Sequence, residues 1–71
     1  MNTATLIRMA NKIAHNFGAY PPEVATEKLA LHLRENWEKR MLTDLIDYVN
    51  QNGSGIDVVV QKATAVLRAR H

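Results

Sequence analysis

Few side chains in this 71-residue chain are suited to catalysis or metal binding, and they are scattered. The chain has no cysteine, and its histidines, His15, His32 and His71, lie at spacings that match no metal-binding motif. Its single serine, Ser54, stands between two glycines in a pattern typical of a flexible turn. The sequence therefore argues against a histidine or cysteine metal site and against serine-based nucleophilic catalysis.

Carboxylates are present, but they lie at helical spacing on polar faces. Glu35 and Glu38 form one such pair, and Asp44 and Asp47 form another. Carboxylates at this spacing are usually solvated or paired with lysine and arginine. The sequence also lacks a glycine-rich phosphate loop, and so short a helical chain leaves little room for a catalytic cavity. We therefore expect no catalytic residue and no metal site in this chain.

The length of the chain predicts a single domain, residues 1–71. A domain of this size removes only about 60% of its unfolded surface from water, so it usually needs a disulfide, a metal or a partner chain for stability. The absence of cysteine excludes a disulfide and most zinc sites, which favours association with another protein. No apolar run is long enough to span a membrane and no signal-peptide pattern is present, so we expect a cytoplasmic protein with no membrane contact.

Charge is distributed unevenly along the chain. The formal net charge is +2 with a pI near 9.3, and six of the seven acids fall between Glu23 and Asp47. Because both ends of the chain are basic, binding of nucleic acid is an alternative function. The residues involved would be Arg8, Lys12 and His15 of the first helix, or Arg68 and Arg70 of the last. The basic residues are few and no helix-turn-helix pattern appears, so we regard nucleic acid as an unfavoured partner.

The pattern of apolar residues predicts an all-α fold, a small bundle of three to four helices at about 5–17, 22–37, 40–50 and 57–69. The first helix is the most clearly amphipathic, with one apolar face formed by Leu6, Ile7, Met9, Ala10, Ile13, Ala14 and Phe17. Thr3 or Thr5 can cap its start, and the Pro21-Pro22 pair prevents its continuation.

The second predicted helix begins at Pro22, a favoured residue for a first helical turn. Its main apolar stripe recurs every four residues and consists of Ala25, Leu29, Leu33 and Trp37. Val24 and Leu31 lie on the opposite side of the helix. We expect the bundle to bury this pair as well, and the alternative is a contact with another molecule.

The apolar arc of the third helix is rotated away from that of the second, so a single straight helix could not bury both. We therefore expect a bend or break near residues 38–40, although Glu, Lys and Arg give no chemical stop signal. Residues 50–55 predict a turn, after which Asp57 can cap the last helix. The run 58–60 consists of valines, which prefer strands, but no second strand is available to pair with it.

The most informative residues surround the predicted junction of the second and third helices. The candidate partner-binding residues are Arg8, Asn11, His32, Trp37, Arg40 and Met41. We expect Trp37 to fill the corner of the bundle beside His32, with a ring nitrogen of His32 bonded to the backbone or to Asn36. The alternative places Trp37, Arg40 and Arg8 in an exposed anchor, because tryptophan and arginine are enriched among binding hot spots.

These residues resemble the delta subunit of molybdenum-containing, NAD-dependent formate dehydrogenases. The resemblance extends from about Leu6 to Leu67 and consists of Leu6-Ile-Arg-Met-Ala-Asn11, His32-x4-Trp37-x2-Arg40-Met41 and Gly53-x-Gly55-Ile56-Asp57. The chain departs from that pattern at Asn36, Glu38 and Lys39, where the family tends to have an aromatic residue, Asp and Pro, and at Val58 in place of a helix-starting proline. Without the proline at position 39, a fixed break between the second and third helices is missing.

The resemblance implies a non-catalytic accessory subunit that supports the assembly, maturation or stability of a cytoplasmic enzyme. Its partners would be the larger formate dehydrogenase subunits, which hold the molybdenum pterin, iron–sulfur clusters and FMN. A different possibility is self-association into a homo-oligomer through Val24 and Leu31 or through the corner around Trp37.

Overall fold

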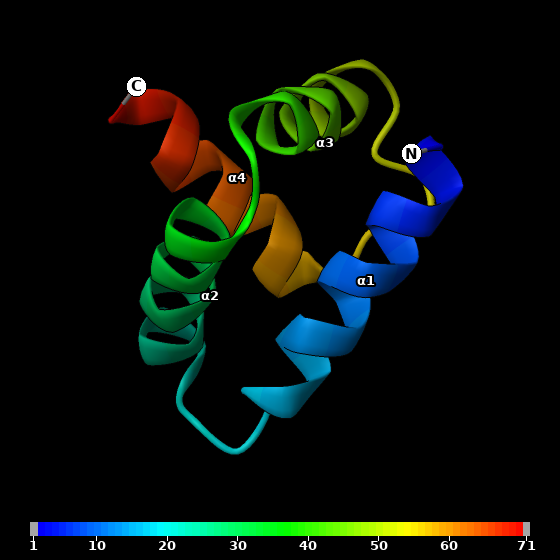
Figure 1. The fold of residues 1–71 in the computed structure, drawn as a ribbon. Coiled ribbons are helices and arrows are strands. Elements are labelled where there is room, and N and C mark those ends of the chain that lie inside the picture. Colours follow the sequence, from blue (N-terminus) through cyan, green and yellow to red (C-terminus); the bar gives the residue numbers. More distant parts are fainter. Residues whose placement is uncertain (1, 71) are drawn as a thin grey trace.

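The computed structural model describes residues 2–70, which form helices and no strand (Figure 1). The four helices of this part of the chain are α1 (Thr3–Asn16), α2 (Pro22–Asn36), α3 (Lys39–Gln51) and α4 (Val58–Ala69). The all-α prediction and its helical segments are therefore confirmed, with ends that differ from the expected ones by one or two residues.

One apolar core joins all of the described helices. Figure 1 shows α1 and α2 diverging from the turn that joins them, with α4 between them and α3 across the open end. The most extensive contact is between α2 and α4, although α3 separates them in the sequence. The fully or almost fully buried apolar side chains are Leu6, Ala10, Ala14, Ala25, Leu29, Ala30, Leu33, Leu45, Val60 and Ala63. The predicted stripe of α2 faces this core.

Side chains outside the first turn cap two of the helices. The Oδ1 atom of Asn2 accepts a hydrogen bond from the Thr5 amide at 2.9 Å, so the prediction that Thr3 or Thr5 caps α1 was wrong. Both threonines lie inside the helix, whereas Asn2 is extended and can direct its oxygen toward a free amide. Asp57 caps α4 as predicted, by accepting from the Val59 amide at 2.8 Å.

The predicted break between the second and third helices is confirmed, at Trp37 and Glu38. These residues are extended, with ψ angles of 141° and 152°, and the Trp37 amide makes the last helical bond, to the Leu33 carbonyl. The side-chain amide of Asn36 donates to the His32 carbonyl at 2.9 Å and so occupies an acceptor at the end of α2. The break therefore forms without a proline.

The connection from α3 to α4, residues 53–57, is held by several bonds, and we call it the anchored loop. The Tyr48 carbonyl accepts from the amides of Asn52 and Gly53, and the Tyr48 hydroxyl donates to the Ser54 carbonyl at 2.8 Å. Gly53 and Gly55 have φ angles of 70° and 75°, a conformation that glycine adopts without steric cost. Although the sequence suggests a flexible turn around Ser54, the backbone here is fixed by side-chain contacts.

Candidate partner-binding surfaces

The predicted partner-binding residues lie in three different environments. Arg8 and Arg40 are exposed, Asn11, His32 and Met41 are half-buried, and Trp37 is buried. They therefore do not form one exposed surface, and each has to be considered with its own contacts.

Trp37 fills the corner between α2 and α3. Its side chain is only 8% exposed and belongs to the same apolar cluster as Leu33 and Leu45. The extended backbone after Asn36 ends the helix and allows the indole to enter the core. This confirms the expected packing role and contradicts the alternative of an exposed tryptophan anchor. Met41, in the first turn of α3, packs against the same cluster.

Asn11 joins α1 to the anchored loop. Its Nδ2 atom donates to the Gly55 carbonyl at 2.9 Å, and its Oδ1 atom accepts from the Asp57 amide at 3.0 Å. Both ends of the side-chain amide are therefore used within the chain. No sequence pattern indicates this contact, because the partners are more than 40 residues away and are backbone groups.

His32 belongs to an aromatic group at the α1–α2 turn. Its ring meets Phe17 edge to face with centroids 6.4 Å apart, Phe17 in turn lies 6.2 Å from Tyr20, and the Lys28 ammonium stands 4.8 Å above Tyr20. The expectation that a ring nitrogen of His32 bonds to the backbone or to Asn36 was wrong, since neither bond occurs among residues 2–70 and Asn36 binds the backbone carbonyl of His32. The environment of His32 is thus one of ring packing.

Arg8 and Arg40 are the predicted residues that remain accessible. Neither forms an ion pair with any residue in 2–70, where the pair present joins Arg70 to Glu27 at 3.4 Å. Their charges are therefore available at the surface, on α1 and in the first turn of α3. The structure does not support their combination with Trp37 in an exposed anchor.

The outer face of α2 carries exposed apolar residues. Val24 is 40% exposed and Leu31 is 48% exposed, so the expectation that the bundle buries this pair was wrong. The reason is that the other helices pack on the opposite side of α2, over Ala25, Leu29 and Leu33, which are at most 2% exposed. The alternative, contact with another molecule, therefore gains support.

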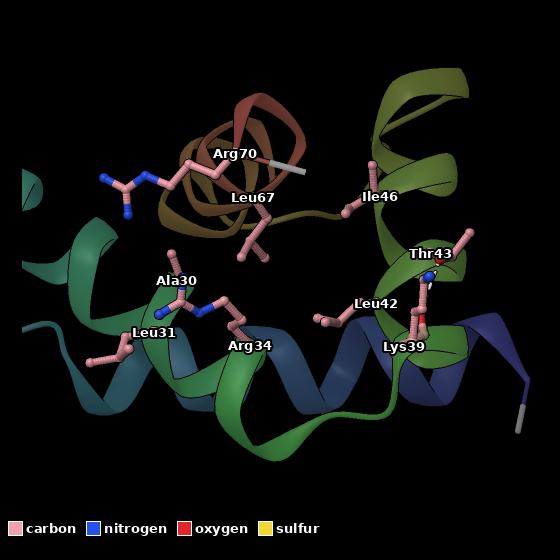
Figure 2. A pocket seen from close by; sticks show the side chains of 9 residues that line it. All are labelled: Ala30, Leu31, Arg34, Lys39, Leu42, Thr43, Ile46, Leu67 and Arg70. Atoms are coloured by element: carbon pink, nitrogen blue, oxygen red, sulfur yellow. Dashed lines mark hydrogen bonds between the residues drawn. The ribbon is translucent and has the colours of Figure 1, made fainter.

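Leu31 borders an open groove between α2, α3 and α4 with a volume of about 160 Å³ (Figure 2). Its apolar lining consists of Ala30, Leu31, Leu42, Ile46 and Leu67, and its polar lining of Arg34, Lys39, Thr43 and Arg70. Figure 2 shows Leu42 and Leu67 pointing into the space between the helices, with Lys39 on the α3 side and the guanidinium groups of Arg34 and Arg70 toward α2. We call this feature the α2/α3/α4 groove.

The groove is basic as well as apolar. Its lining includes three cations and, among residues 2–70, no carboxylate. The Arg70–Glu27 pair lies at the surface with both side chains more than half exposed, and the Thr43 hydroxyl donates to the Lys39 carbonyl at 3.0 Å. The chemistry of these groups suits binding of an apolar group that carries negative charge beside it.

Residues 2–70 contain no group of three or more His, Cys, Asp or Glu side chains placed to hold a metal ion. None of the helices in that range has the length and apolar character needed to cross a membrane.

Sequence reasoning singled out Leu31 and, as a possible nucleic-acid contact, Arg70, but it did not identify the other residues of the groove. Leu31 stood out as an apolar residue away from the main stripe, and Arg34 follows it three positions later on the same helix face. The groove also requires α3 and α4 to lie beside this face, which depends on tertiary packing. Helical periodicity in one segment carries no such information.

Comparison with known proteins identifies a family. The family model described as NADH-dependent formate dehydrogenase delta subunit FdsD matches residues 5–64. No curated protein and no solved structure gives a significant match to the chain. The matched range includes every predicted partner-binding residue and most of the groove, while Leu67 and Arg70 lie beyond it.

Proposed function

The chain belongs to the family of NADH-dependent formate dehydrogenase delta subunits, and from this premise we propose that it is a non-catalytic accessory subunit of a formate dehydrogenase complex. The resemblance found in the sequence motifs and the family match over residues 5–64 agree. The single observation that carries the proposal is this match, because it covers α2 and α3 completely, nearly all of α1 and the first part of α4.

The partners in this proposal are the larger subunits of the complex. They would hold the molybdenum pterin, the iron–sulfur clusters and FMN, and this chain would bind no cofactor of its own. It would act in the cytoplasm by supporting the assembly, maturation or stability of the catalytic subunits. The exposed apolar residues of α2 and the basic, apolar groove support a role in binding another protein.

The way the chain uses its polar side chains is consistent with a structural role. Asn11 and Tyr48 hold the anchored loop, Asp57 caps α4, and the buried hydroxyls of Thr26 and Thr64 donate to carbonyls of their own helices. These groups stabilise the bundle, and the groove offers apolar contacts and fixed cations. Such a surface binds a partner without taking part in bond making.

Co-purification from the host tests the proposal directly. A tagged full-length chain should recover a molybdenum-containing oxidoreductase together with formate-dependent reduction of NAD. Recovery of the chain alone, or only with unrelated proteins, would contradict the proposal. An otherwise identical strain that lacks the tag provides the background.

A deletion strain distinguishes the three forms of support. If the chain assists maturation, the catalytic subunits purified from that strain should contain less molybdenum. If it assists assembly, the subunits should separate on gel filtration. If it contributes only stability, the complex should form with its metal but lose activity faster on warming. Normal metal content, assembly and stability in the deletion strain would contradict a supporting role.

A further inference from the structure

We propose that the α2/α3/α4 groove is the surface through which this chain binds its partner, and that the occupant is a short acidic segment of a larger subunit with one apolar anchor side chain. This inference rests on the proposed function and adds to it the surface and the chemistry of the partner segment.

The apolar part of the groove has room for one side chain. Its volume of about 160 Å³ is close to that of an apolar cavity of about 150 Å³ that admits benzene. Leu31, Leu42 and Leu67 come from three different helices, so the packing of the bundle fixes their relative positions. Covering Leu31, which is 48% exposed, would remove apolar surface from water that folding leaves accessible.

The charges around the groove select an acidic segment. Arg34 and Lys39 are exposed and form no ion pair with any residue in 2–70. Arg70 forms an ion pair with one exposed acid, Glu27. An incoming carboxylate beside the apolar anchor would meet cations on more than one side, which favours encounter and orientation. A basic or neutral segment would gain no such contact.

The start of α3 adds positive potential at the same place. No side chain caps this helix and its first turn contains no acid, although its exposed N-cap residue, Glu38, is a carboxylate that forms no ion pair among residues 2–70. Lys39 and Arg40 instead place two cations beside the positive end of the helix dipole. Because Lys39 and Thr43 line the groove, a carboxylate bound there would be favoured by both the side chains and the helix.

A second copy of this chain is a poorer occupant. A symmetric dimer would place the same surface on both sides, so Arg34, Lys39 and Arg70 would face their own copies without a compensating acid in the groove. A nucleic acid is also a poorer fit. The apolar lining is aliphatic and offers no aromatic ring on which a base could stack.

Introducing negative charge at the groove tests the proposal. The readout is co-purification of the tagged full-length chain with the larger subunits. The variants are Leu31→Glu and Lys39→Glu, and the matched controls are Val58→Glu, at an apolar residue 61% exposed, and Lys62→Glu, at an exposed lysine of α4. We expect the amount of larger subunit per tagged chain to fall about tenfold for Leu31→Glu and several-fold for Lys39→Glu. The control variants should stay within about twofold of the wild type.

Circular dichroism provides the check on folding. All four exchanged positions are exposed or lie at a helix start, so the variants should keep the helical spectrum and the melting temperature of the wild type. A groove variant that keeps its fold and still recovers the larger subunits at the wild-type level would overturn the inference.

Cross-linking identifies the occupant. A photoreactive residue at position 31 of the full-length chain in the complex should cross-link to a larger-subunit segment in which an apolar residue is flanked by Asp or Glu, and one at position 58 should not. Cross-links from position 31 to a basic segment, to nucleic acid or to a second copy of this chain would overturn the inference. So would their absence in a complex that forms normally.

The two proposals fail in different ways. If the wild-type chain recovers the larger subunits but the groove variants and cross-links behave as the controls, the groove is not the binding surface and the proposed function stands. If the wild-type chain fails to recover the larger subunits, the proposed function is wrong and the inference falls with it.

Discussion

The anchored loop and the α2/α3/α4 groove use their side chains in opposite ways. At the anchored loop, Asn11 and Tyr48 donate to the carbonyls of Gly55 and Ser54, and Ile56 is buried. At the groove, by contrast, apolar and cationic groups face solvent, and the one ion pair described there is exposed. The loop contributes to the stability of the isolated chain, whereas the groove leaves favourable contacts unmade.

This comparison changes the interpretation of the sequence motifs. Asn11 and Trp37 both belong to motifs that carry the family resemblance, and both make contacts within the chain. Leu31 and Arg34 flank His32 and precede Trp37, and they lie at the open groove. A residue in a recognisable motif can therefore stabilise the fold, while its neighbours at the surface are free to bind a partner.

The largest effect is expected for Trp37→Ala. Truncation of a buried tryptophan costs about 3–5 kcal/mol, and a chain of this length has a total stability of only about 4–10 kcal/mol. The free energy of unfolding, measured by urea titration with circular dichroism, should fall by that amount. Tyr20→Ala, at an aromatic residue 45% exposed, should cost less than about 1 kcal/mol. Equal losses for the two variants would show that Trp37 is not part of the core.

Asn11→Ala should have the next largest effect. The change leaves the Gly55 carbonyl and the Asp57 amide without their partner, which costs about 1–2 kcal/mol at this partly exposed site. Hydrogen exchange at the Asp57 amide should also become faster. Asn16→Ala, at an exposed residue ending α1, is the control and should change stability by less than about 0.5 kcal/mol. If the variant kept the stability of the wild type but no longer co-purified with the larger subunits, Asn11 would instead have a role in binding.

Gly53→Ala should destabilise the chain by about 1 kcal/mol. The φ angle of 70° is unfavourable for alanine, and the new Cβ atom would lie 3.3 Å from the Val49 carbonyl oxygen. Thermal melting should reveal the loss, and Ser54→Ala in the same turn is the control, with a melting temperature close to that of the wild type. A Gly53→Ala variant as stable as this control would show that the loop is less constrained than its bonds indicate.

The smallest effect on stability is expected at the groove. Leu31→Ala should change the free energy of unfolding by about 0.5 kcal/mol or less, because the side chain is 48% exposed and alanine favours helix. Leu29→Ala, two positions earlier and fully buried, should cost about 2–5 kcal/mol in the same urea titration. If Leu31→Ala were as costly as Leu29→Ala, the groove would be part of the core.

Most of the fold could be predicted from local patterns in the sequence. The apolar periodicity of α1, the proline at the start of α2 and the Asp57 cap each act within one or two turns of helix. The break at Trp37 could be predicted because the apolar arcs on its two sides are rotated relative to each other. The Asn2 cap was missed because the neighbouring threonines are equally suitable by residue type.

The candidate site could be predicted only in part, since it depends on contacts between distant residues. The tie from Asn11 to Gly55 and Asp57 crosses 44 to 46 residues, and no spacing rule within a helix contains it. The exposure of Val24 and Leu31 depends on which side of α2 the other helices cover, and periodicity allowed either side to be buried. The groove itself requires the relative placement of three helices.

The same long-range tie affects the order in which the protein can fold during its synthesis. The N-terminal part of a chain leaves the ribosome first, and α1 packs mainly on α3 and α4, which follow later. Asn11 can make its bonds only after residues 55 and 57 have been added. Until then the apolar face of α1 lacks its main partners, so α1 gains its native contacts well after its own synthesis.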